Sequence, residues 1–461
     1  MPPQASNSSR IDLATLADLA QKLAQSAKSR GVDLAEVKAG QGWELDTKVR
    51  LGQRELVQEA GHKSVALRVM RDQRVAVTSS SDLSEAGLER LLRDAFELLE
   101  LSQPDPFAGP APSELLQQKT DLDLDLLDPE VDRVDAARAT EMATQAERAA
   151  LDYDKRITLS EGATVSRVTG GSVLVLADGF VGTQLGSYIS IVVSPVVEDQ
   201  GGKRRRGHYW AARRHLADLE PGEEVGREAA RRTLRQLGPR KIDSCEIPIV
   251  FDPDTARSVI GSFAGCLLGG AIWRRSSYLA EREGSQVASP LITLIDDPLI
   301  PRAPGSRVFD GEGVASRRNV VVEQGNLRTF LLDSYAARKL SRSTTASASR
   351  GGGSVSASTS NFIMQAGSQS REALIASTAK GLYVTEMMGQ GFNPVTGDFS
   401  RGATGYWIEN GELTFPVSEV TISSNLDRMM KNIDAVANDL DLKTSTAAPT
   451  FRVAAMTISG T

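Results

Sequence analysis

The sequence predicts an α+β protein: a mixed α/β N-terminal region of two subdomains, followed by a strand-rich C-terminal domain. In the first 241 residues, segments with apolar residues at helical spacing are interspersed with short strand-like runs. Beyond residue 242, strand-like runs separated by turn signals dominate. A breaker-rich linker at residues 103–114 divides the N-terminal region. Strand-rich order with segregated helices is typical of the α+β class.

The first predicted subdomain, residues 1–115, opens with a helix and contains a second one. Apolar residues recur at helical spacing behind Ser9, a suitable N-cap. Strands are predicted at residues 64–71 and 74–78, and a helix at 83–101. The residues that carry the first helical pattern are Ile11, Leu13, Leu16, Leu19 and Leu23.

The second predicted subdomain, residues 116–241, has a helix at 132–151 and another at 225–237. Between them the pattern predicts strands at 156–161, 173–177 and 187–197, and a hairpin through the turn at 200–207 to residues 208–213.

The third predicted domain, residues 242–461, begins with a buried strand and one glycine-rich helix over residues 255–272. Turn signals at 324–326 and 410–411 predict two hairpins. The segment 341–361 is low in complexity and rich in Ser, Thr and Gly, so we expect a mobile surface loop. A substrate lid is the alternative for this segment.

Composition excludes several classes of protein. The net charge of −6 and pI of about 5.5 argue against a nucleic-acid partner. Two cysteines, Cys245 and Cys266, are too few for a disulfide-stapled secreted fold. The N-terminus does not have the pattern of a signal peptide, and the longest apolar stretch is too short to span a membrane. We therefore expect a cytoplasmic protein without membrane contact.

The usual hydrolytic motifs are missing from the sequence. Its three histidines, His62, His208 and His215, do not have the spacing of a helical zinc motif. The sequence contains no G-x-S-x-G nucleophile elbow, no phosphate-binding P-loop and no dinucleotide-binding fingerprint. Cys266 lies in an apolar run without an adjacent base.

Two polar clusters have open alternatives. Asp296-Asp297 and the pair Asp310 and Glu312 either form turns or hold a hard cation such as Mg²⁺; turns are favoured. The basic run at residues 203–206 is interpreted as a solvated turn rather than a phosphate site.

Three glycines, Gly261, Gly265 and Gly269, are spaced about one turn apart in the predicted helix. Glycine costs about 1 kcal/mol relative to alanine in a helix, so a close approach by another backbone should compensate. That approach either is tight packing within the domain or marks a groove floor or subunit contact.

Long stretches of the third domain resemble the TldD/PmbA family. They read SPLITLIDDPLIPRAPGSRVFDGEGVASRRNVVVEQGNLRTFLLDSYAARKL at 289–340, GLYVTEMMGQGFNPVTGDFSRGATGYWIENGE at 381–412 and NIDAVANDL at 432–440. The second block is similar through GREAARRTLRQLGPRKI at 226–242. The sequence of the 393–412 stretch resembles that of members of the TldE (PmbA) branch.

The resemblance implies a fold of the TldD/PmbA type and a role in proteolysis. TldD-type members carry an HExxxH helix just before the stretch that reads SPLIT here, at residues 289–293, and a cysteine ligand nearer the C-terminus. In this sequence the helix segment reads SVIGSFAGCLLGGAIW at 258–273, and no cysteine follows Cys266. The implied protein is a non-catalytic subunit, inactive alone, with no metal of its own. Its implied partner is a TldD-type subunit that brings zinc, and the implied substrate is a short or unfolded peptide.

Three residues are candidates for contact with peptide: Asp398, Arg401 and Gly402. Arg401 would pair either with a peptide carboxylate or with Asp398, and the second is favoured. The alternative function is a homo-oligomeric peptide-binding protein without catalysis. Carboxylate-bound metal hydrolysis is a third.

Overall fold

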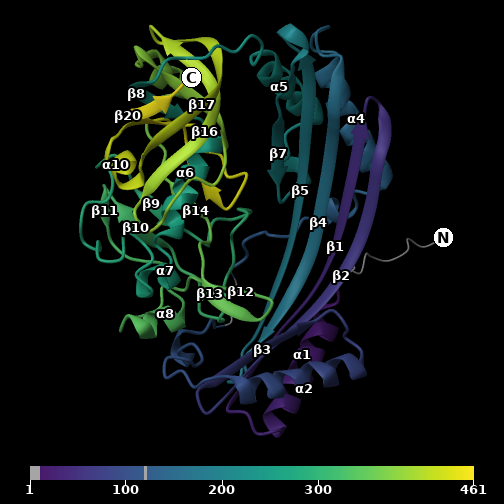
Figure 1. The fold of residues 1–461 in the computed structure, drawn as a ribbon. Coiled ribbons are helices and arrows are strands. Elements are labelled where there is room, and N and C mark those ends of the chain that lie inside the picture. Colours follow the sequence, from purple (N-terminus) through teal and green to yellow (C-terminus); the bar gives the residue numbers. More distant parts are fainter. Residues whose placement is uncertain (1–10, 119–121, 461) are drawn as a thin grey trace, which may run out of the picture.

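A computed structural model describes residues 11–118 and 122–460. It confirms the α+β class: one large, strongly elongated sheet with helices stands beside a strand-rich C-terminal domain (Figure 1). Ser9, the predicted N-cap, lies outside the described residues, and Asp12 caps the first described helix, α1 (Leu13–Ser29).

Both predicted N-terminal subdomains contribute strands to the large sheet, whose order is β3-β2-β1-β4-β5-β6, with β7 also paired to β5. The sequence pattern did not predict the central strand at 34–50, and the two strands predicted at 156–161 and 173–177 are a single strand over 159–175. Hydrogen bonding to long neighbours extends these strands through polar segments without apolar alternation. The strands are β1 (Leu34–Arg50), β2 (Gln53–Arg71), β3 (Arg74–Ser80), β4 (Leu159–Val175), β5 (Val181–Glu198), β6 (Arg204–Arg206) and β7 (Tyr209–Arg213).

Helices cover one face of this sheet. The apolar side chains that pack against them come from odd-numbered positions of β1, such as Val37, Ala39 and Leu45. Since successive side chains of a strand point to opposite faces, even-numbered positions of β1 face the other way, toward the C-terminal domain. The helices are α1, α2 (Glu85–Leu101), α3 (Pro129–Asp132), α4 (Ala136–Leu151) and α5 (Gly222–Leu234).

The C-terminal domain contains two larger sheets around an apolar core. One has the order β17-β16-β15-β8-β20-β18, and the other β11-β10-β9-β14-β19. Its strands are β8 (Cys245–Phe251), β9 (Leu294–Asp296), β10 (Asn319–Glu323), β11 (Asn326–Leu327), β12 (Ala348–Gly351), β13 (Ser354–Ala357), β14 (Phe362–Met364), β15 (Lys380–Met388), β16 (Asp398–Glu409), β17 (Glu412–Asn425), β18 (Ile433–Val436), β19 (Thr446–Ala447) and β20 (Phe451–Ser459). Its helices are α6 (Pro253–Gly265), α7 (Gly269–Trp273), α8 (Ser334–Lys339), α9 (Arg371–Ala376) and α10 (Leu426–Lys431).

Both predicted hairpin turns of this domain are confirmed. Gln324 and Gly325 have φ of 46° and 82° between β10 and β11, and Asn410 and Gly411 have φ of 53° and 79° between β16 and β17. Two successive residues with positive φ are the signature of the tight turns that suit antiparallel hairpins.

The single helix predicted over residues 255–272 is wrong. α6 ends at Gly265, and Leu268 is extended before α7 begins. The amide of Gly269 donates to the carbonyl of Leu331, and the amide of Leu331 donates to the carbonyl of Leu267 (2.8 and 3.1 Å). These bonds to a distant segment replace the bonds of a continuous helix.

The loop predicted at residues 341–361 is also wrong, because this segment contains the hairpin of β12 and β13. Several of its polar groups are satisfied by distant partners. The amide of Leu332 donates to the hydroxyl of Thr345 at 2.6 Å, and the amide of Ala348 donates to the carboxylate of Asp310 at 3.0 Å. Composition alone could not reveal this, since the hydrogen-bond partners lie elsewhere in the chain.

Candidate functional site

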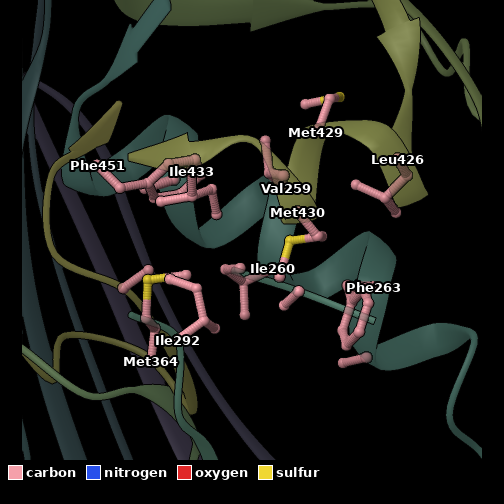
Figure 2. Packing of buried hydrophobic residues seen from close by; sticks show 14 of the residues in the cluster. Val259, Ile260, Phe263, Ile292, Met364, Leu426, Met429, Met430, Ile433 and Phe451 are labelled. Carbon is pink, nitrogen blue, oxygen red and sulfur yellow. The ribbon is translucent and has the colours of Figure 1, made fainter. Parts of the chain in front are cut away.

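Helix α6 has one apolar face and one small, polar face. Its apolar face packs into the core through Val259, Ile260 and Phe263, which lie among side chains of α10 and neighbouring strands in Figure 2. The helix begins at Asp252, whose carboxylate accepts hydrogen bonds from the amides of Asp254 and Thr255. The opposite face carries Ser258, Gly261, Ser262 and Gly265, which are half-buried or exposed.

The three singled-out glycines separate into two environments. A Cβ on Gly269 would lie 2.5 Å from the Cβ of Ala336, so this glycine is required by packing within the domain. A Cβ on Gly261 would meet only Thr446, at 4.0 Å, and one on Gly265 would meet nothing within 4 Å. No other backbone of the described chain therefore compensates Gly261 and Gly265, and the open face of α6 stays available to something else.

Arg401 lies on β16 next to this face. Its guanidinium donates to the hydroxyl of Ser258 (2.8 Å) and to the carbonyl of Gly389 (2.9 Å). The favoured pairing of Arg401 with Asp398 is wrong: Asp398 instead accepts from the hydroxyl of Thr396 (2.6 Å) and the amide side chain of Asn425. Arg401 and Asp398 share one strand, but only Arg401 reaches α6. Gly402 follows on β16, in ordinary contact with Met388.

The residues around α6 do not fit a zinc ion. The helix face offers hydroxyls and glycines, and the thiol of Cys266 points to the carbonyl of Ser262 at 3.5 Å. Burial raises the pKa of the Cys266 thiol to about 11, whereas zinc binds the thiolate. Over residues 11–118 and 122–460, no group of three or more His, Cys, Asp and Glu side chains is placed to hold a metal ion.

A charged cavity of about 360 Å³ adjoins the N-terminus of α6, between α5 and the C-terminal domain. Arg232 of α5 lies 3.9 Å from Asp252 and 3.8 Å from Asp254. Burial and the neighbouring charge of Asp254 raise the pKa of the Asp252 carboxyl. Sequence patterns did not single out Asp252 or Arg232, although an acidic pair at a helix start was a visible signal. The charged lining is Arg231, Arg232, Arg235, Arg371, Asp252, Asp254, Glu372 and Glu386.

The acidic cluster of the third domain forms turns at Asp297 and Asp310, as favoured, but not at Asp296. Asp296 is the last residue of β9 and accepts from the amide of Ser360 at 2.6 Å. Asp310 accepts from the amides of Glu312 and Val314 (2.8 and 3.0 Å), and Glu312 accepts from the amide of Ser334 (2.8 Å). Burial, and next the charge of Asp310, raises the pKa of Glu312 to about 7. Burial raises the pKa of Asp296 to about 6.

These buried acids predict a stability that falls as pH rises. A carboxyl with a raised folded pKa binds more protons in the folded than in the unfolded state between its unfolded pKa of about 4.3 and its folded value. The free energy of unfolding should therefore decline between about pH 4.5 and 7. Glu312→Gln should unfold like wild type at pH 5 but be more stable at pH 8 by about 1–3 kcal/mol. Urea titrations at both pH values measure this, with the exposed Glu97→Gln as a control that shifts neither curve.

The three histidines lie at separate places in the structure, and the basic run at residues 203–206 forms ion pairs with nearby acids. His62 lies on β2, His208 just before β7, and the Nε2 atom of His215 is 2.9 Å from the carbonyl oxygen of Asp125. Arg205 pairs with Asp199 and Arg206 with Glu161, so two cations of the run already have acidic partners.

Family models of the PmbA/TldA metallopeptidase match three parts of the chain: domain 1 at residues 35–99, the central domain at 129–237 and the C-terminal domain at 244–460. Metalloprotease PmbA of Escherichia coli O157:H7 is 34% identical over 94% of this chain and 93% of its own length. A TldD homolog of Haemophilus influenzae is 29% identical over 64% of both chains.

Comparison with solved structures supports the same family. A Bacteroides thetaiotaomicron protein described as a modulator of DNA gyrase superimposes with a TM-score of 0.90 at 27% identity, covering 96% of this chain and 98% of that one. TldE from Thermococcus kodakarensis, at 20% identity, shares the fold with a TM-score of 0.84 over 96% of this chain and all of its own. No helix in the described part of the chain has the length and hydropathy to cross a membrane. The chain belongs to the PmbA/TldD metallopeptidase family, in its PmbA (TldE) branch.

Proposed function

We propose that this chain is the subunit without metal in a two-subunit peptidase. A TldD-type partner would supply the zinc, and the complex would cleave short or unfolded peptides in the cytoplasm. The observation that carries the proposal is the open face of α6, where serines and glycines stand in place of metal-binding side chains.

The chemistry of that face suits binding rather than bond cleavage. Serine hydroxyls can bind an extended peptide, and small residues allow its backbone to approach closely. Arg401 is held by two hydrogen bonds, which makes it a positioned donor for a peptide carbonyl or carboxylate. The identity to PmbA over nearly the full chain supports this assignment over the TldD branch.

The test is a peptidase assay on this chain, on a TldD-type protein from the same organism, and on their co-purified mixture. Only the mixture should cleave an unfolded peptide, and a chelator should abolish that cleavage. Cleavage by this chain alone would contradict the proposal. A stable homo-oligomer that binds peptide but does not bind the TldD-type protein would favour the alternative, a peptide-binding protein without catalysis.

A bulky side chain on the open face of α6 should block this function without harming the fold. Gly265→Trp introduces a large ring where a Cβ meets nothing within 4 Å, so the thermal midpoint should stay near that of wild type. Activity of the mixture should fall by ~10-fold or more, because the ring occupies the proposed peptide path or partner contact. Glu97→Trp on the exposed face of α2 is the matched control. Equal activity of both variants would show that the α6 face takes no part.

A further inference from the structure

An open cavity lies between the large sheet and the C-terminal domain, on the sheet face opposite the helices. It has two adjoining parts of about 430 and 370 Å³, which share Lys38, Gly40 and Ser64 as lining residues. One part reaches Ser79 of β3, and the other reaches Gly186 of β5. The cavity thus crosses five neighbouring strands, β3-β2-β1-β4-β5. Four strand spacings of about 4.8 Å give it a length of roughly 19 Å.

Small residues create this space. Gly40 and Ser64 lie opposite each other on β1 and β2, and Gly40 and Ser172 on β1 and β4. Larger side chains at these even-numbered positions of β1 would fill the gap to the C-terminal domain. Their absence leaves a trough lined largely by serine hydroxyls and glycine backbone.

Lys38 lies in the middle of the trough and has no acidic partner among the described residues. Its Nζ donates to the carbonyl oxygen of Arg350 at 3.1 Å. An ammonium group carries three N–H donors, so two remain for another acceptor. Burial, and then the charges of Arg350 and Arg307, lowers the pKa of Lys38. Arg350 itself is compensated by Glu36 at 2.6 Å.

Arg214 supplies a second such cation at the β5 end. Its guanidinium donates to carbonyl oxygens of Ala303 (3.0 Å) and Pro304 (2.6 Å), and more weakly to those of Leu126 and Ser187. Burial lowers the pKa of Arg214. Carbonyls accept hydrogen bonds but carry no net charge, so no described residue offsets the charge of this guanidinium.

The described lining of the trough therefore carries positive charge without negative charge. Its charged members are Lys38 and Arg350 in one part and Lys38 and Arg214 in the other, and none of the described lining residues is Asp or Glu. A desolvated cation without a partner is unfavourable, and an anionic ligand would offset this. The cavity at α6 differs, because its four arginines face four acids.

We propose that this trough binds an extended acidic peptide segment, whose carboxylates pair with Lys38 and Arg214. A length of roughly 19 Å accommodates five or six extended residues at about 3.3 Å each. The choice of a peptide as the anion rests on the proposed function, and it gives that function a preference for acidic sequences.

The test uses the full chain alone and a fluorescein-labelled hexapeptide of alternating glutamate and serine, followed by fluorescence anisotropy. The same peptide with glutamine in place of glutamate is the reference. The acidic peptide should bind more tightly, and more weakly as salt rises. Lys38→Met should weaken its binding by about 10-fold or more, the loss expected for one charge-assisted hydrogen bond. Lys38→Arg should retain binding.

Two controls separate the site from general charge effects. Lys63→Met removes an equal charge from an exposed position of β2 and should leave binding unchanged. Gly40→Leu keeps every charge but fills the trough, and should abolish binding; thermal melts verify that each variant is folded. Equal affinity for both peptides, or unchanged affinity in Lys38→Met and Gly40→Leu, would overturn the proposal. Binding of inorganic phosphate with no binding of either peptide would do the same.

These measurements need neither the TldD-type partner nor proteolysis. If the acidic peptide binds at Lys38 but the mixture of subunits cleaves nothing, the proposed function fails and the binding site stands. If the mixture cleaves acidic and neutral peptides alike and Lys38→Met has no effect on binding, the trough is not the site while the proposed function survives.

Discussion

Gly269→Ala should destabilise the protein by about 1–3 kcal/mol, the usual cost of overpacking a core. A Cβ at this position would lie 2.5 Å from the Cβ of Ala336, 3.0 Å from a methyl of Leu332 and 3.3 Å from the carbonyl oxygen of Leu331. The backbone cannot retreat easily, because the amide of Gly269 donates to that same carbonyl at 2.8 Å. Urea unfolding followed by circular dichroism measures the loss.

Gly265→Ala is the matched control, four residues earlier in the chain. A Cβ there meets no atom within 4 Å. Alanine reduces the conformational entropy of the unfolded chain, so this variant should gain up to about 1 kcal/mol. The two substitutions are chemically identical and should have opposite signs. A loss of stability in Gly265→Ala would mean that the α6 face is more tightly packed than the structure indicates.

Glu36→Gln should cost about 3–5 kcal/mol, the effect of removing one partner from a buried ion pair. The Glu36 carboxylate is 3.0 Å from Arg68 and 2.6 Å from Arg350, and both sides of the Arg350 pair are almost fully buried. Burial alone would raise the pKa of Glu36, but the charges of Arg350 and Arg68 outweigh burial and lower it. The stabilisation is therefore present above the unfolded pKa of about 4.3 and lost as pH falls below it.

Glu36 joins the large sheet to the hairpin of β12 and β13, so its loss should also loosen the contact between them. Hydrogen exchange at residues 348–357 should accelerate in Glu36→Gln before the rest of the C-terminal domain does. Glu55→Gln, which breaks an exposed pair with Lys48, should change stability by less than about 1 kcal/mol. Arg350→Met should cost less in the Glu36→Gln background than alone, because the two residues share one interaction. Additive effects would contradict this account.

Local chemistry allowed several features to be predicted. The helix predicted at 83–101, which forms α2, and tight turns with glycine, such as Asn410-Gly411, depend on residues that are adjacent in the chain. The turn role of Asp310 and Glu312 follows from the same local hydrogen bonding. The absence of an HExxxH motif on the helix before the SPLIT-like stretch could also be found without coordinates.

The sequence by itself determined the α+β class, the family resemblance and the absence of an HExxxH motif, since all three depend on motifs and short-range patterns. Only the tertiary structure decided that the Ser-rich segment is a hairpin, that Gly269 is packed while Gly265 is open, and that Arg401 reaches Ser258 rather than Asp398. It also placed Lys38, one of several charged residues of β1, opposite a distant hairpin, where none of the described acids pairs with it. Each of these features depends on contacts between residues that are distant in the sequence, and only the tertiary packing determines those contacts.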